Sequence, residues 1–177
     1  MSRAGLRILG GELRGRRLEV AGSVRPTEAR LREALASIWQ PLFAGCRFLD
    51  LFAGSGAMGL EALSRGAERA WFVDSDPRVL RALRRNCERL APAATRILRL
   101  RLPSGRDLGE RFELIFADPP YAFGDHAALL RGAAGWLERG GEMAIEHSAR
   151  REVPAVEPWV GVARRCYGES CLSFFRL

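Results

Sequence analysis

The 177-residue sequence has no lysine, no apolar run long enough to span a bilayer and no CxxC pair of cysteines. Without a stretch of about 20 apolar residues, a chain has no predicted membrane span. Its first eleven residues are basic but not continuously apolar, unlike a secretory signal. The sequence has four cysteines, Cys46, Cys87, Cys166 and Cys171. They lack the spacing of zinc ligands and are predicted to be thiols in a reducing compartment. These absences predict a soluble cytoplasmic protein without a metal site or a membrane partner.

Positive charge is unevenly spread. All 28 basic residues are arginine, and the formal net charge is +7. Codon bias in a GC-rich genome explains the missing lysine but not the excess of positive charge. Residues 1–40 contain eight arginines against four glutamates, whereas the remainder contains 20 arginines against 17 acids. A basic N-terminal region on a nearly balanced body is typical of a protein that binds a polyanion.

The first 41 residues form a predicted appendage. Two short extended stretches, residues 6–9 and 16–20, flank a glycine-rich segment and predict a hairpin. A helix is then expected, with Thr27 as its N-cap and apolar residues at helical spacing. Pro41 ends this region, which leaves residues 42–177 as the main domain.

Strand and helix patterns alternate in the main domain. The predicted strands are 47–52, 69–73, 97–100, 112–117 and 142–146, and the predicted helices are 57–65, 76–90 and 125–137. Residues 161–167 and 171–176 flank a short turn and predict an antiparallel hairpin. The expected fold is therefore α/β: a mostly parallel, doubly wound sheet with a C-terminal antiparallel hairpin, binding ligands at the carboxyl ends of its strands.

A glycine-rich loop follows the first of these strands. It contains the predicted cofactor-binding residues Asp50, Phe52, Ala53, Gly54, Ser55 and Gly56. With Gly59, the glycines also satisfy GxGxxG, which alone is weak evidence for a dinucleotide. A carboxylate beside the loop gives no advantage to an anionic pyrophosphate. It does suit S-adenosylmethionine, which carries an ammonium and a sulfonium group.

Asp74 is predicted to end the second strand, 20 residues beyond Gly54. A carboxylate at this place accepts hydrogen bonds from ribose hydroxyls. That reading holds for NAD and for S-adenosylmethionine alike. Asp76 is predicted only to cap the next helix.

The segment Asp118-Pro119-Pro120-Tyr121 is predicted to end the fourth strand. It resembles the signature of nucleic-acid amino-methyltransferases: Asn or Asp, two prolines and an aromatic residue. An amino group conjugated to a base is a poor nucleophile, and Asp118 and the Pro119 carbonyl can each accept one of its N–H bonds. The prolines fix these acceptors, and Tyr121 can stack on the base. Asp118, Pro119 and Tyr121 are the predicted catalytic residues.

The likeness extends to the N-terminus. The segments that carry it are Arg7-Ile8-Leu9-Gly10-Gly11, Arg14-Gly15-Arg16, Arg25-Pro26-Thr27, Arg30–Leu35 and Gly59-Leu60-Glu61-Ala62. Together with the glycine loop and the Asp-Pro-Pro-Tyr segment, they resemble the RsmD-type family, bacterial guanine-N2 methyltransferases of 16S ribosomal RNA.

The resemblance implies a Rossmann-like class I methyltransferase that uses S-adenosylmethionine. Ribosomal RNA or the small ribosomal subunit is the implied partner, and a monomer is expected. It places Thr27 near the cofactor and makes the basic hairpin an RNA contact. The RNA-binding residues so predicted are Arg7, Arg14, Arg16, Arg17 and Arg25.

One departure and three alternatives remain. The family usually has a polar or acidic residue after the third strand for the adenine amino group, but here no carboxylate occurs before Asp107. Backbone groups, Ser104 or a shifted Asp107 are the candidates. The alternative functions are a DNA adenine methyltransferase, a nucleic-acid-binding module without catalysis and, more remotely, a nicotinamide oxidoreductase.

Overall fold

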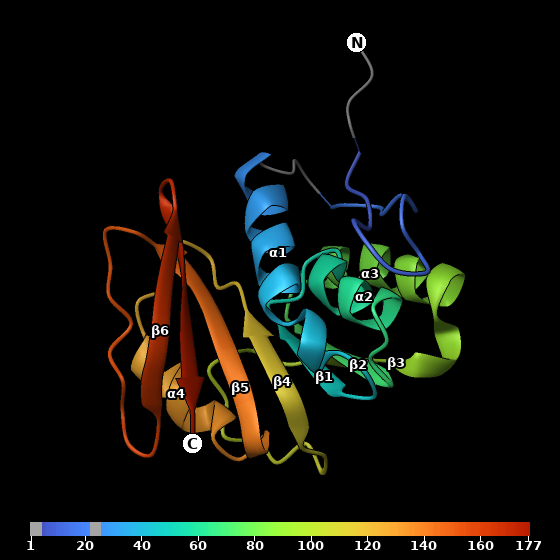
Figure 1. The fold of residues 1–177 in the computed structure, drawn as a ribbon. Coiled ribbons are helices and arrows are strands. Elements are labelled where there is room, and N and C mark those ends of the chain that lie inside the picture. The colour runs from blue at the N-terminus through green and yellow to red at the C-terminus, as the bar shows by residue number, and fades with distance from the viewer. Residues whose placement is uncertain (1–4, 22–25) are drawn as a thin grey trace.

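A seven-stranded sheet forms the centre of the computed structural model, which describes residues 5–21 and 26–177, without the side chains of residues 26–28. The strand order is β3-β2-β1-β4-β5-β7-β6 (Figure 1). The bounds are β1 Arg47–Leu51, β2 Arg69–Asp74, β3 Thr95–Arg99, β4 Phe112–Ala117, β5 Leu137–Ser148, β6 Val160–Tyr167 and β7 Ser170–Arg176. The first five strands are parallel, whereas β7 is antiparallel to β5 and to β6. The predicted sheet and its antiparallel hairpin are confirmed.

Helices cover both faces of this sheet (Figure 1). Their bounds are α1 Pro26–Ile38, α2 Ala57–Ser64, α3 Pro77–Leu90 and α4 His126–Ala133. Residues of α1, α2 and α3 pack in one hydrophobic cluster, and those of α4 in a second cluster on the opposite face. The predicted helix 125–137 is wrong at its end, because Leu137 pairs with Phe112 of β4 and begins β5. A ladder with a distant strand thus overrides a locally helical pattern.

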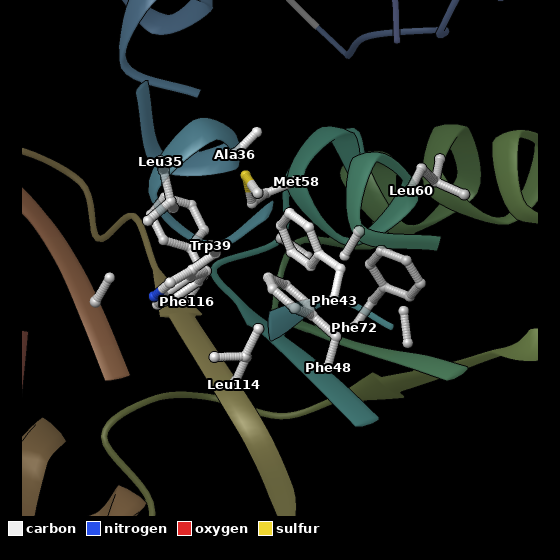
Figure 2. Packing of buried hydrophobic residues seen from close by; sticks show 14 of the residues in the cluster. Leu35, Ala36, Trp39, Phe43, Phe48, Met58, Leu60, Phe72, Leu114 and Phe116 are labelled. Carbon is white, nitrogen blue, oxygen red and sulfur yellow. The ribbon is translucent and has the colours of Figure 1, made fainter. Parts of the chain in front are cut away.

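The larger hydrophobic cluster lies between α1, α2 and the sheet (Figure 2). Trp39 is fully buried there, edge-on to the rings of Phe48 and Phe174, at centroid distances of 6.0 and 6.2 Å. Its indole N–H donates to Glu142 Oε1 over 2.7 Å, which satisfies the polar tip of the ring. The N-terminal helix is therefore part of the main core.

The N-terminal hairpin is narrow. Arg7 and Arg17 form a single antiparallel bridge, and the Leu18 N–H donates to the Leu6 carbonyl over 2.8 Å. Leu6, Ile8 and Leu18 belong to the same buried cluster as α1 and α2. The division of the chain at residue 41 stays a prediction. Helix α1 begins at Pro26, so Thr27 is its second residue and not its N-cap.

The two cysteine pairs differ. Cys46 and Cys87 are buried thiols, and burial raises the pKa of each to about 12. Cys166 and Cys171 face each other across the β6–β7 ladder and form a disulfide. The prediction that all four are thiols is wrong for this pair, because the hairpin register brings them opposite one another. Among the described residues, no helix is both long and apolar enough to cross a membrane.

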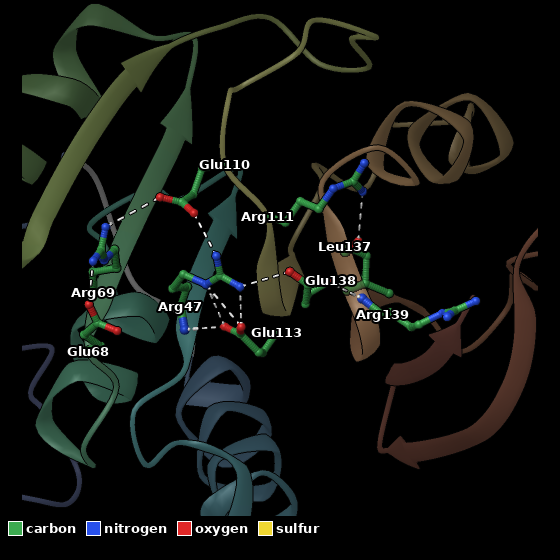
Figure 3. A network of polar contacts seen from close by, with 9 residues as sticks. All are labelled: Arg47, Glu68, Arg69, Glu110, Arg111, Glu113, Leu137, Glu138 and Arg139. Atoms are coloured by element: carbon green, nitrogen blue, oxygen red, sulfur yellow. Dashed lines mark hydrogen bonds and ion pairs between the residues drawn. The ribbon is translucent and has the colours of Figure 1, made fainter.

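The amino-end edge of the parallel strands is held by ion pairs (Figure 3). Arg47, at the start of β1, contacts Glu110, Glu113 and Glu138 at 2.8, 2.5 and 3.1 Å. The hydrogen bond to Glu113 is the main reason that the pKa of Arg47 is raised above its usual value. These ion pairs join residues at the end of the sheet where the parallel strands begin. The candidate site lies at the other end, where these strands finish.

Candidate active site

A cavity of about 250 Å³ lies at the carboxyl ends of β1, β4 and β5. Its described lining residues come from the N-terminal hairpin, α1, the glycine loop, α2 and these strands: Leu6, Arg32, Asp50, Phe52, Ala53, Gly54, Ser55, Ala57, Met58, Phe116, Asp118 and Glu146. The cavity brings the predicted glycine loop and the predicted catalytic carboxylate Asp118 together in one place. We call it the main cleft.

The glycine loop turns sharply at three residues. Gly54 and Gly56 have φ of +55° and +78°, and Phe52 has φ of +56°. A left-handed conformation costs a residue with a side chain about 1–2 kcal/mol, and such strain gathers at functional sites. The Phe52 ring packs edge-on against Phe123, with centroids 5.3 Å apart. This contact joins the loop to the segment after Asp-Pro-Pro-Tyr.

Asp74 holds the loop from the end of β2. Its Oδ2 accepts the Gly54 N–H over 3.1 Å, and its Oδ1 accepts the Asp76 N–H over 3.0 Å. Asp76 in turn caps α3 by accepting the Arg78 N–H over 2.8 Å, as predicted. The half-buried Asp74 carboxylate is therefore fixed beside the loop, and its role toward a ribose stays a prediction.

Asp50 is the buried carboxylate of the site. Its Oδ2 accepts the Gly59 N–H from α2 over 2.9 Å. Burial raises the pKa of Asp50 well above its usual value, and the charges of Asp118 and Asp74 raise it further. A carboxylate held near others in a low-dielectric place is best stabilised by a cation. The site is thus suited to a positively charged ligand group.

The Asp-Pro-Pro-Tyr segment borders the main cleft. The Asp118 N–H donates to the Leu51 carbonyl over 3.3 Å, which anchors the segment beside β1. The Asp118 side chain lines the main cleft, while Tyr121 is 48% exposed and its hydroxyl lies 3.2 Å from Ser170 Oγ. Pro119 is buried. Of the three predicted catalytic residues, only Asp118 lines the main cleft, and all three line a smaller cavity beside it.

Two histidines lie next to the Asp-Pro-Pro-Tyr segment. His126 and His147 line a small cavity of about 20 Å³ that includes Asp118, Tyr121 and Glu146. Burial lowers the pKa of both imidazoles. His147 Nδ1 donates to the Ser148 carbonyl over 2.9 Å, and Nε2 lies 2.8 Å from Ser173 Oγ. Their spacing in the sequence gave no sign of this proximity.

Sequence reasoning missed two charged residues of the main cleft. Glu146 lies near the carboxyl end of β5, and Arg32 reaches the cleft from α1 while its Nη2 donates to the Arg7 carbonyl over 2.7 Å. The signal for Glu146 was present, because carboxyl ends of neighbouring parallel strands meet at one edge. Arg32 depends on how α1 packs, which no local pattern specifies.

Neither side-chain candidate for adenine recognition lies in the main cleft. Asp107 lines a surface hollow with Arg47, Glu110 and Glu138 at the opposite edge of the sheet. Ser104 lies against Gly132 of α4, and its hydroxyl accepts the Arg106 N–H over 3.1 Å.

The predicted RNA contacts fall into two groups. Arg7, Arg14, Arg16 and Arg17 are exposed on the N-terminal hairpin. Arg25 and the side chain of Thr27 lie outside the described residues. Their roles toward RNA and cofactor stay predictions.

The N-terminal motif docks on α2. The fully buried carboxylate of Glu61 accepts the backbone N–H groups of Leu9 and Gly10, each over 2.8 Å. Gly11 has φ of +72°, and a Cβ there would collide with the backbone of Ser64. The Arg-Ile-Leu-Gly-Gly segment and Glu61 are therefore the two halves of one contact, which carries Leu6 to the main cleft.

The sheet order, the antiparallel β7 and the placement of the cleft are those of class I methyltransferases. Residues 6–176 match the family model described as Conserved hypothetical protein 95, and the chain belongs to this family, the RsmD family.

Relatives extend this result. Ribosomal RNA small subunit methyltransferase D of Escherichia coli K12 is 35% identical over 156 residues, which covers 85% of this chain and 79% of that protein. Its Haemophilus influenzae namesake is 30% identical over 172 residues, covering 92% and 89%. A solved structure of a hypothetical protein from Thermus thermophilus superposes with a TM-score of 0.80 at 39% identity, covering 97% and 99%.

Proposed function

We propose that the protein transfers a methyl group from S-adenosylmethionine to the exocyclic N2 amino group of a guanine in 16S ribosomal RNA. The observation that carries this proposal is the meeting of Asp118 with the glycine loop and Asp50 in one cleft. The names of the Escherichia coli and Haemophilus influenzae relatives support a small-subunit ribosomal RNA as substrate. We further propose that the protein acts as a monomer in the cytoplasm.

The electrostatics of the main cleft support a cationic cofactor. Asp50, Asp118 and Glu146 line it beside Arg32, and burial disfavours a negative charge on Asp50. The ligand's ammonium and sulfonium groups would offset these carboxylates, and its sulfonium would supply the electrophilic methyl. Asp50, Phe52, Ala53, Gly54, Ser55, Gly56 and Thr27 are the residues proposed to hold it, with Asp74 at the ribose.

The hydrogen bonds of the loop argue against a dinucleotide. A pyrophosphate is bound by free backbone N–H groups at a helix N-terminus. Here the Gly54 and Gly59 N–H groups donate to the carboxylates of Asp74 and Asp50. An anion would have to compete with both carboxylates for these donors.

The proposed role of Asp118 is to orient the target amino group. Its carboxylate and the Pro119 carbonyl would each accept one N–H, which favours a tetrahedral nitrogen with its lone pair toward the methyl. The Asp118 backbone is anchored to β1 through the Leu51 carbonyl, so the acceptor is positioned before the substrate arrives. Tyr121, half exposed beside it, would stack on the base.

The test is methyl transfer by Asp118 variants under single-turnover conditions. Asp118→Ala removes the acceptor, and the rate should fall on the order of a hundredfold or more. Asp118→Asn keeps an acceptor oxygen and should retain partial activity. Asp107→Ala, which removes an exposed carboxylate at the opposite edge of the sheet, is the matched control. Near-wild-type turnover of Asp118→Ala, with cofactor binding intact, would refute the role.

The product decides between the proposed function and DNA adenine methylation. Ribosomal RNA and genomic DNA are incubated separately with labelled S-adenosylmethionine and digested to nucleosides. The proposal expects the label in N2-methylguanosine from RNA. Label in N6-methyladenine from DNA would favour the alternative, and no label in either would favour a module without catalysis.

A further inference from the structure

The positive charge of the chain is concentrated in one internal segment. Residues 77–106 contain nine arginines and a single acid, Glu88, which gives this segment a formal charge of +8. The net charge of the whole chain is +7, so the other 147 residues together are close to neutral. The apparent balance of residues 41–177 is therefore an average over a strongly basic segment and acidic neighbours.

This segment forms one edge of the domain. It comprises α3, the connection after it, the edge strand β3 and the chain that follows (Figure 1). All nine arginines are exposed: Arg78, Arg81, Arg84, Arg85, Arg89, Arg96, Arg99, Arg101 and Arg106. Arg96 stacks on Trp71 of the cluster on the α4 face, and the Arg106 carbonyl accepts the indole N–H of Trp136 in that cluster. We call the other seven residues the α3–β3 arginine surface.

The fold of α3 turns these arginines outward. Leu80, Leu83 and Cys87 bury one side of the helix against the sheet. Arg81, Arg85 and Arg89 recur every four residues on the exposed side, which spaces them about 6 Å apart along the helix axis. A row of cations at this interval is suited to run along a charged backbone.

Several of these guanidinium groups have protein partners. Arg78 pairs with Asp76 at 3.3 Å, Arg85 pairs with Glu19 at 2.6 Å, and Arg89 donates to a backbone carbonyl of the N-terminal hairpin. Within residues 5–21 and 26–177, four others form no ion pair: Arg81, Arg84, Arg99 and Arg101. Their mutual repulsion is uncompensated within the described part of the chain, which is a cost that an external polyanion would relieve.

The arginine surface joins the hairpin to the site. At one end Arg89 Nη2 donates to the Arg17 carbonyl, in the N-terminal hairpin. The buried side-chain amide of Asn86, also on α3, links the two regions. It donates to the carbonyl of Glu19 beside the hairpin over 2.9 Å and to the carbonyl of Ser55 in the glycine loop over 3.0 Å. At the other end, Arg99 is opposite Asp74 in the β2–β3 register. The surface therefore extends from the hairpin to the residue that holds the glycine loop.

We propose that the α3–β3 arginine surface is the main contact for the phosphates of the RNA substrate, and that the N-terminal hairpin extends it. The inference rests on the proposed function, since it assigns a surface to that substrate. Arginine suits this role because its planar guanidinium binds phosphate oxygens in pairs and keeps its charge at all physiological pH values.

The test compares three charge-removing variants for binding to a 16S ribosomal RNA transcript. The surface variant carries Arg81→Gln, Arg84→Gln, Arg99→Gln and Arg101→Gln. The hairpin variant carries Arg14→Gln, Arg16→Gln and Arg17→Gln. A matched control removes four exposed arginines elsewhere: Arg111→Gln, Arg131→Gln, Arg139→Gln and Arg165→Gln. The dissociation constant is measured from 50 to 300 mM salt (roughly the range in which counterion release is resolved).

The surface variant should lose about three units of the slope of log K against log salt, since each phosphate contact contributes about 0.7. At about 0.1 M salt, the affinity loss should be on the order of a hundredfold. The hairpin variant should lose less, the control should lose little, and cofactor binding should persist in all three. The pair Arg81→Gln and Arg84→Gln alone should give about half the loss of slope, and it provides a second variant on the exposed side of α3.

Two results would overturn the inference: an unchanged slope in the surface variants, or an equal loss in the control. Neither affects the proposed function if the wild-type protein still yields N2-methylguanosine. A wild-type protein that neither binds nor methylates the transcript would overturn the proposed function itself.

Discussion

Removing the Glu61 carboxylate should release the N-terminal segment from α2. The side chain is fully buried and accepts three hydrogen bonds of 2.8 Å, from the backbone N–H groups of Leu9 and Gly10 and from Arg65 Nε. In Glu61→Ala the two backbone donors lose a charged acceptor inside a packed contact. The hairpin that they anchor carries Leu6, which lines the main cleft.

The structure sets the magnitude of this effect. A hydrogen bond to a charged group stabilises by about 1.5–3 kcal/mol, so two backbone bonds contribute about 3–6 kcal/mol. Water can reach the freed donors because the hairpin lies at the surface, so we expect a loss of about 4 kcal/mol in the free energy of unfolding. With a urea dependence of about 2 kcal/mol per molar, the unfolding midpoint should fall by about 2 M.

Urea unfolding followed by circular dichroism measures this loss, and hydrogen exchange at Leu9 and Gly10 localises it. Glu68→Ala is the control, since Glu68 pairs with Arg69 on the surface and its removal should cost less than about 0.5 kcal/mol. A loss below about 1 kcal/mol in Glu61→Ala, with both amides still protected, would show that the contact is incidental.

Two further predictions concern the site. Calorimetry should detect S-adenosylmethionine binding but not NAD binding, and Asp50→Asn should weaken the former about tenfold by removing a charged acceptor; tight NAD binding would contradict the assignment. Burial lowers the pKa of His126 and His147 in the folded protein. The unfolded chain therefore binds protons first, and stability should fall as the pH drops below about 6.5. Thermal unfolding from about pH 8 to 5 measures this, and His147→Gln should flatten the profile; an identical slope would exclude His147 as a cause.

Local patterns predicted most of the elements because their signals are short-range. β4 spans the predicted residues, and Asp76 caps α3 as expected. The failure at residues 134–137 has a different origin. Leu137 is held in β5 by its pairing with Phe112, a residue 25 positions away, and an apolar run gives no sign of such a partner. The Cys166–Cys171 disulfide likewise depends on the register of a hairpin.

The position of the site could be predicted from the sequence because parallel strands place their carboxyl ends at the same end of the sheet. That rule brought Asp50 and Asp118 into one cleft, and Asp74 beside it. Glu146 obeys the same rule but carried no recognisable motif. The arginine surface was hidden for another reason, because a net charge averaged over residues 41–177 conceals a segment of +8 among acidic neighbours.

The glycine pattern shows why a motif has to be weighed with its flanking residues. Gly56 and Gly59 are needed for packing. A Cβ at Gly56 would collide with the Leu83 side chain, and a Cβ at Gly59 would collide with the Phe72 ring. Their spacing thus follows from packing α2 against β2 and α3, a requirement that dinucleotide-binding folds share. The acids beside them make the difference, since Asp50 and Asp74 take N–H groups of the loop and its helix that a pyrophosphate would need. The GxGxxG spacing alone therefore does not distinguish a cationic from an anionic ligand, and the buried Asp50 carboxylate bound to the Gly59 N–H favours the cationic one.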